Sequence, residues 1–251
     1  MIIQIIGLPG SGKTTLAKDL SDRINAIHLN ADDVRTDLSS DLGFSDKDRV
    51  EQARRLGAMA RLLSKQGYVV VVDFVCPTTQ TRKAFGNADY LIWMNTISES
   101  RFADTNIIWE NPEGYDHKFV ELAQHNKADD IIKKLNLFDW SAPTTLQLGR
   151  YQPWHEGHQA LKNEAHKRTN QVLIGVRNTY GTSEKDPLTY KEVERHIRKS
   201  VGHNGDTLVA RLPNITNIVY GRDVGYKIEQ VHLSPEIQAI SATQKRKEMG
   251  L

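Results

Sequence analysis

The chain has 251 residues, of which 39% are hydrophobic and 25% charged, and a net charge of +2. This composition is ordinary for a globular protein, and so small a charge gives no argument for nucleic-acid binding. A single cysteine, Cys76, excludes an internal disulfide framework. No apolar run approaches membrane-spanning length, and no secretory signal is recognisable. We therefore expect a cytoplasmic protein of one large or two modest domains, with neither nucleic acid nor membrane as a partner.

The first predicted element is a buried strand over residues 2–6, a short apolar, β-branched run. The sequence GLPGSGKT at residues 7–14 follows it, matches the pattern G-x-x-x-x-G-K-[ST] at every position, and leads into a helical pattern. Such a loop surrounds phosphate oxygens with backbone N–H groups. The predicted nucleotide-binding residues are Gly7, Gly10, Ser11, Gly12, Lys13, Thr14 and Thr15, with Lys13 at the β- and γ-phosphates and Thr14 at Mg²⁺. The complete match disfavours a glycine turn without function.

Carboxylates follow the next two predicted strands. Residues 26–29 form a short apolar segment that ends before Asp32. Open α/β sheets place their sites at the carboxyl ends of strands, so Asp32 can bind Mg²⁺ or accept a proton from the attacking hydroxyl. N-capping of a helix that starts at Val34 is the alternative role. Asp73 follows the β-branched run at 68–72, and we assign it to Mg²⁺.

The remaining elements of the first half alternate between helix and strand. Residues 44–65 show helical spacing of apolar positions, with Ser45 as a capping residue. Residues 89–94 form another apolar strand. This alternation predicts an α/β fold with a doubly wound parallel sheet.

Three segments of the first half resemble the adenylylsulfate (APS) kinase family. They are NADDVR at 30–35, DLGFS at 41–45 and FVCP at 74–77, in the order and spacing of that family. APS kinases phosphorylate the ribose 3′-hydroxyl of APS with ATP and Mg²⁺. The likeness covers about residues 1–95 and implies that Asp32 is the base. It also implies an acceptor pocket lined by Arg35, Phe44 and Arg49.

The chain departs from the APS kinase pattern at four places. The family's D-G-D-N is NADD here, its helix asparagine is Gln52, and its serine before proline is Cys76. The lysine-rich lid is missing, and residues 100–112 stand in its place. Kinase chemistry is therefore better supported than APS as the acceptor. Arg101 is either a lid arginine or a surface charge.

The second half begins after a helical pattern at 115–137 and the break Ser-Ala-Pro at 141–143. We predict domains at 1–141 and 144–251. A strand at 144–148 runs into GRYQPWHEGH, whose histidines, His155 and His158, share one face at the start of a helix. Two imidazoles beside a helix N-terminus suit a triphosphate. Metal binding is a weaker alternative because no third ligand is evident.

A second motif, ISATQKR at 240–246, completes a resemblance to the HxGH nucleotidyltransferases, especially the archaeal-type nicotinamide mononucleotide (NMN) adenylyltransferases. It implies a small Rossmann-like domain in which an acceptor phosphate attacks the α-phosphorus of a nucleoside triphosphate. The predicted sheet uses strands at 171–176 and 217–220, with a helix at 189–200. A Gly-Arg-Asp segment at 221–223 is similar to one in ATP sulfurylase. The implied nucleotide-binding residues are Arg150, His155, His158, Ser241, Thr243 and Arg246.

Together these motifs predict a bifunctional kinase and nucleotidyltransferase that uses Mg²⁺ and ATP, with CTP as an alternative in the second domain. The expected substrates are small molecules, and the sequence leaves open whether the chain forms a homo-oligomer. Sulfate activation is one functional hypothesis, and nucleoside or alcohol salvage is another, while a non-catalytic nucleotide sensor is a third. The predicted catalytic residues are Lys13, Asp32, His155, His158 and Arg246.

Overall fold

The computed structural model describes residues 1–123, 126–202, 205–219, 221–222, 225, 227–248 and 250. The chain forms two compact units, Met1–Lys134 and Leu135–Leu251. The boundary between the units, after Lys134, lies before the Ser-Ala-Pro break at 141–143, where the sequence predicts a domain boundary. In the part of the chain so described, no helix is both long and apolar enough to span a membrane.

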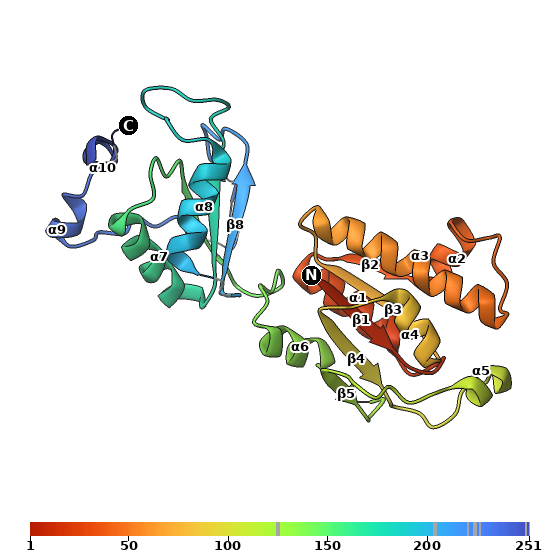
Figure 1. The fold of residues 1–251 in the computed structure, drawn as a ribbon. Coiled ribbons are helices and arrows are strands. Elements are labelled where there is room, and N and C mark those ends of the chain that lie inside the picture. The colour runs from red at the N-terminus through yellow and green to blue at the C-terminus, as the bar shows by residue number, and fades with distance from the viewer. Residues whose placement is uncertain are drawn as a thin grey trace. The chain divides into compact units, whose positions relative to one another are not determined.

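The N-terminal unit alternates strands and helices along most of its length (Figure 1). Its strands all run parallel, in the order β2-β3-β1-β4-β5. The order reverses direction beside β1, so the loop after β1 lies at the topological switch point, where open sheets bind ligands. The elements are β1 (Ile2–Ile6), α1 (Lys13–Ile24), β2 (Ile27–Asn30), α2 (Ala31–Asp37), α3 (Asp46–Lys65), β3 (Val70–Phe74), α4 (Thr79–Phe85), β4 (Tyr90–Met94), α5 (Ala103–Ile108), β5 (His117–Phe119) and α6 (Lys127–Leu135). The α/β fold with a parallel sheet is confirmed.

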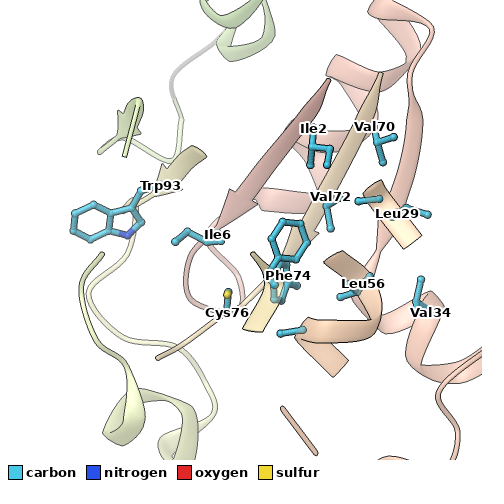
Figure 2. Packing of buried hydrophobic residues seen from close by; sticks show 13 residues of the cluster. Ile2, Ile6, Leu29, Val34, Leu56, Val70, Val72, Phe74, Cys76 and Trp93 are labelled. Carbon is cyan, nitrogen blue, oxygen red and sulfur yellow. The ribbon is translucent and has the colours of Figure 1, made fainter. Parts of the chain in front are cut away.

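The central strands are apolar on both faces because helices cover them. Figure 2 shows one side of this core, where side chains of β1, β2, β3 and α3 meet. The rings of Phe74 and Phe85 lie 5.4 Å apart, which joins β3 to α4. Leu56 of α3 is fully buried against the same cluster. The predicted helix at 44–65 is thus present, and a capping box between Ser45 and Asp48 starts it.

The predicted helix at 115–137 is wrong in its first half. His117–Phe119 instead forms the edge strand β5, and Asp116 accepts a 2.7 Å hydrogen bond from the Leu91 N–H. Pairing with β4 satisfies backbone groups and buries Phe119, which overrides a weak helical pattern. Helix begins only at Lys127.

The C-terminal unit contains a second parallel sheet, in the order β6-β7-β8. Helices α7 and α8 make the two crossovers, and their apolar faces join one core with the sheet. The largest fully buried side chains of this core are those of Ile174 and Ile197. The elements are β6 (Thr145–Gly149), α7 (Glu156–Thr169), β7 (Val172–Arg177), α8 (Tyr190–Val201), β8 (Thr207–Leu212), α9 (Pro235–Gln238) and α10 (Ala242–Glu248).

The third strand of this sheet is not where the sequence places it. Residues 217–219 of the strand predicted at 217–220 form no strand, and Tyr220 lies outside the described residues. Asp223 of the Gly-Arg-Asp segment also lies outside them. Ile218 and Val219 are exposed, so no burial of their side chains favours strand pairing there. The strand is instead Thr207–Leu212, whose Val209 is buried against α8 and β7.

Close packing of α3 on α4 generates a stability prediction. A Cβ on Gly57 would lie 1.9 Å from the Phe85 carbonyl oxygen, so Gly57→Ala must push the helices apart. The helix-propensity gain of alanine, about 1 kcal/mol, is smaller than such a clash. We expect the free energy of unfolding to fall by about 1–3 kcal/mol. Hydrogen exchange of the slowest-exchanging amides of β1 measures this loss. Gly114→Ala is the control, because that position has open space, and an equal effect of both changes would contradict the prediction.

Candidate active sites

The loop after β1 has the conformation that a phosphate-binding loop requires. Gly7, Gly10 and Gly12 have φ angles of 152°, 89° and 87°, which disfavour any side chain. A Cβ at Gly7 would also lie 2.5 Å from the Met94 carbonyl oxygen. Ser11 is buried, and its N–H donates to the Leu8 carbonyl. The loop therefore presents its backbone to the N-terminus of α1, where Thr15 lies exposed in the first turn.

Lys13 is buried at the start of α1. Its ammonium group donates a 2.9 Å hydrogen bond to the Leu8 carbonyl, inside the loop. Burial lowers the pKa of Lys13 to about 8, although the charges of Asp73 and Asp32 act in the opposite direction. A desolvated ammonium group at the N-terminus of a helix attracts a polyphosphate strongly.

Asp73 is the centre of a hydrogen-bond network at the carboxyl ends of β2 and β3. It accepts hydrogen bonds from Thr14 (2.6 Å) and Asn30 (3.2 Å), and lies 2.6 Å from His28 Nε2. Burial would raise the pKa of Asp73, but the hydrogen bonds from His28 and Thr14 outweigh it, so the pKa is lowered. The carboxylate is thus ionised at neutral pH.

The Thr14 hydroxyl and the Asp73 carboxylate fit a magnesium ion. Both are hard oxygen donors at the phosphate loop, and Mg²⁺ uses one or two such ligands together with substrate phosphates. No group of three or more His, Cys, Asp or Glu side chains suited to a metal occurs among the described residues.

Asp32 lies in the first turn of α2 and is exposed. The alternative that Asp32 caps this helix is wrong, because the Asn30 side chain accepts the N–H groups of Asp32 and Asp33. The carboxylate of Asp32 is close enough to raise the pKa of Lys13 electrostatically. Asp32 therefore has no capping role, and its charge acts on Lys13 of the phosphate loop.

Arg35, Phe44 and Arg49 come together beside α2, and we call them the acceptor cluster. The guanidinium carbons of Arg35 and Arg49 lie 4.7 and 5.8 Å from the centre of the Phe44 ring. Arg49 also donates a 2.9 Å hydrogen bond to the Phe44 carbonyl. The preceding loop is held by Arg55, which pairs with Asp41 at 2.6 Å. The structure therefore assembles the residues that the APS kinase resemblance places in one pocket.

The segment at 100–112, which replaces the lysine-rich lid, is tied down at both ends. The side chains of Ser100 and Asn106 close its first turn. Glu110 accepts a 2.6 Å hydrogen bond from the Thr79 N–H at the start of α4. Between these anchors Asp104 forms a 2.8 Å ion pair with Arg49. Arg101 stacks on the neighbouring Phe102 ring at 4.8 Å, as a surface charge would.

Cys76 belongs to the core rather than to the site. It is 1% exposed in the cluster of Figure 2, and burial raises the pKa of its thiol to about 12. A thiol so protonated is a poor nucleophile.

The two motif histidines meet at the start of α7 in the C-terminal unit. His155 caps the helix by accepting the Gly157 N–H at 3.1 Å, and its ring stacks on that of His158 at 3.8 Å. Tyr151 and Trp154 pack around His158. Burial and the neighbouring His155 lower the pKa of His158 to about 4, so this imidazole is neutral at pH 7.

The second motif lies against the first. Arg246 of α10 donates a 2.9 Å hydrogen bond to the Gln152 carbonyl and a 3.1 Å hydrogen bond to the Thr243 hydroxyl. Ser241 accepts the Gln244 N–H and so caps α10. Residues 94 positions apart in sequence thus meet beside the histidines.

Arg150 is held from the opposite side of the same loop. It pairs with Asp186 at 3.2 Å, while Gln152 and Leu188 exchange two hydrogen bonds of 2.8 and 2.9 Å. These contacts fix the loop after β6 to the segment before α8. The predicted site residues of the C-terminal unit therefore surround one loop.

Several residues of these sites were missed in the sequence. His28 and Asn30 contact Asp73 because β2 pairs with β3 in a register that aligns Asn30 with Asp73. Their two-residue spacing was a usable signal, since it puts both side chains on one face of a strand. Asp104 carried no signal, because its partner Arg49 is distant in sequence and belongs to another element.

The comparisons with known proteins concern the N-terminal half. Residues 1–92 match the model of the adenylylsulphate kinase family. The adenylyl-sulfate kinase of Vibrio cholerae is 37% identical over 105 residues, which are 38% of this chain and 49% of that protein. The bifunctional enzyme NodQ of Azospirillum brasilense is 39% identical over 88 residues, 33% of this chain and 14% of NodQ. The chain thus spans less than half the length of either relative.

A solved structure of an APS kinase from Mycobacterium tuberculosis is 26% identical, covers 53% of this chain and 95% of its own, and has a TM-score of 0.45. The family match supports the sequence-based resemblance of the N-terminal part to APS kinases.

The buried Lys13 predicts a pH dependence of nucleotide binding. A bound polyphosphate favours the charged amine, so the free protein must take up a proton once the pH exceeds about 8. The ATP affinity of the N-terminal unit should be flat below pH 8 and fall about tenfold per pH unit above it. Calorimetry in two buffers of different ionisation enthalpy measures the proton uptake. An affinity that is constant from pH 7 to 10 would contradict this prediction.

The buried His158 predicts a pH dependence of stability. Since its pKa is lowered to about 4, the unfolded chain binds a proton below pH 6.5 that the folded unit does not. The C-terminal unit should lose up to about 1 kcal/mol per pH unit between pH 6.5 and 4. Hydrogen exchange of β7 amides measures the loss, and His158→Gln should flatten it. The exposed His232→Gln is the control.

Proposed function

We propose that the chain is a bifunctional enzyme. Its N-terminal unit transfers the γ-phosphoryl group of ATP to a hydroxyl of a small acceptor. Its C-terminal unit transfers a nucleotidyl group, adenylyl by preference and cytidylyl as the alternative, to a phosphate-bearing small molecule and releases pyrophosphate. The observation that carries the first activity is the loop of Lys13 and Thr14 joined to Asp73.

In the kinase reaction, Lys13 and the loop N–H groups hold the phosphates while the acceptor hydroxyl approaches the γ-phosphorus. Asp32 accepts the hydroxyl proton, the new P–O bond forms, and ADP leaves. Arg35, Phe44 and Arg49 hold the acceptor. A magnesium ion at Thr14 and Asp73 would neutralise charge on the phosphates. Positioning and electrostatics supply the catalysis.

The second activity is supported by the contact of Arg246 with the loop that carries His155 and His158. An acceptor phosphate oxygen attacks the α-phosphorus, and pyrophosphate leaves without a covalent enzyme intermediate. The imidazoles donate hydrogen bonds to the phosphates, with Arg150, Ser241, Thr243 and Arg246 around them. Phosphates that bind at His158 favour its charged form, which its burial otherwise disfavours.

Two pathways suit this pair of activities. In sulfate activation the kinase acceptor is APS, which agrees with the family that residues 1–92 match. In a salvage pathway the kinase phosphorylates a nucleoside or alcohol, and the second unit adds a nucleotidyl group to the new phosphate. The ion pair of Arg49 with Asp104 favours the salvage pathway. A nucleotide sensor without turnover is the third hypothesis.

The two activities should be separable by single substitutions. With Mg-ATP and either APS or a nucleoside, we expect a phosphorylated product that falls at least about a hundredfold in Lys13→Ala. With Mg-ATP and a phosphate acceptor such as NMN, pyrophosphate release should fall similarly in Arg246→Ala and stay unchanged in Lys13→Ala. Mass spectrometry and a pyrophosphate assay measure these products. Tight ATP binding without any product would support the sensor instead.

A further inference from the structure

The acceptor cluster holds a carboxylate that the APS kinase motifs do not include. Asp104 Oδ2 lies 2.8 Å from Arg49 Nη2. The Arg49 side chain is 14% exposed and that of Asp104 is 67% exposed. The carboxylate of Asp104 is therefore the solvent-exposed partner of a pair whose guanidinium is largely covered.

We propose that Asp104 is a specificity residue that excludes anionic acceptors, so that the kinase unit phosphorylates an uncharged hydroxyl compound such as a nucleoside. This inference rests on the proposed kinase function of the N-terminal unit. It assigns the charge of the acceptor, which the family match leaves open.

The position of Asp104 is fixed by the fold. Helix α5 is held before its start by the turn of Ser100 and Asn106. After its end, the Glu110 N–H donates to the Pro77 carbonyl at 2.8 Å, and Arg82 donates to the Glu110 carbonyl at 3.1 Å. The segment thus carries Asp104 on a tethered helix, so the ion pair with Arg49 forms with little further loss of conformational entropy.

The charges of the cluster do not suit a polyanion. Arg35 and Arg49 supply two guanidinium groups, while Asp32 and Asp48 act electrostatically on Arg35 and Asp104 pairs with Arg49. The guanidinium of Arg49 is therefore already paired with a carboxylate before any acceptor binds. A phosphosulfate would have to displace Asp104 from Arg49 and then lie beside it, which is a like-charge contact. An uncharged acceptor meets neither cost.

The exposed part of the cluster offers another kind of contact. Phe44 is 66% exposed as a residue, although the guanidinium groups of Arg35 and Arg49 lie over its ring. A planar uncharged ring can stack against such an aromatic side chain without any ionic partner. Binding through Phe44 would leave the ion pair of Arg49 and Asp104 intact.

The test compares two probes that differ by the anionic group, APS and adenosine. Their dissociation constants are measured by calorimetry on the full chain saturated with Mg²⁺ and a non-hydrolysable ATP analogue. Wild type should bind adenosine more tightly than APS. Asp104→Asn should shift this preference toward APS by about tenfold or more, since it frees Arg49 and removes a like charge. Asp19→Asn, an exposed position on α1, makes the same change in net charge and should shift nothing.

A double-mutant cycle isolates the ion pair. The gain in APS affinity should disappear when Asp104→Asn is combined with Arg49→Ala, because the freed guanidinium is what binds the anion. Retained binding of the ATP analogue in every variant reports an intact fold. The proposal is overturned if wild type prefers APS, if Asp104→Asn leaves the preference unchanged, or if neither probe binds. A shift in binding preference without phosphoryl transfer to any probe would refute the kinase function and leave the charge selection standing.

Discussion

The N-terminal site depends on one buried carboxylate. Asp73 is 1% exposed, and it joins β3 to the phosphate loop through Thr14 and to β2 through His28 and Asn30. Without these three partners, a carboxylate buried this deeply would take up a proton and lose its negative charge. The hydrogen bonds therefore fix the relative positions of two strands and one helix and, by the same contacts, keep the charge that a magnesium ion needs.

The two units use the same electrostatic arrangement with different side chains. In each, a basic group is buried beside the N-terminus of a helix that follows a parallel strand, Lys13 in one and His158 in the other. Burial lowers the pKa of both groups, which disfavours their charged forms as long as no anion is bound. The energetic cost of that burial is offset when phosphates arrive. The two loops differ in sequence, yet each places a buried basic side chain at the start of a helix.

The sequence predicts most of what is local. The strand at residues 2–6, the glycine loop and the helix at 44–65 were readable because propensity, spacing and capping agree there, as at Ser45. The errors lie where tertiary pairing decides. His117–Phe119 is a strand because β4 offers it an edge, and residues 217–219 are not one because no partner buries them. The partners of Asp73 and Arg49 depend on strand order and on helix packing, which a single sequence does not reveal.

The contact of Arg246 with Gln152 also has a consequence for synthesis. All residues of the proposed kinase site lie before position 105, so a ribosome could release the whole N-terminal unit while the rest of the chain is still being made. The proposed nucleotidyltransferase site includes Arg246 of α10, so the loop at Gln152 gains this contact only after 94 further residues have been made. The two sites of one polypeptide thus mature at different times.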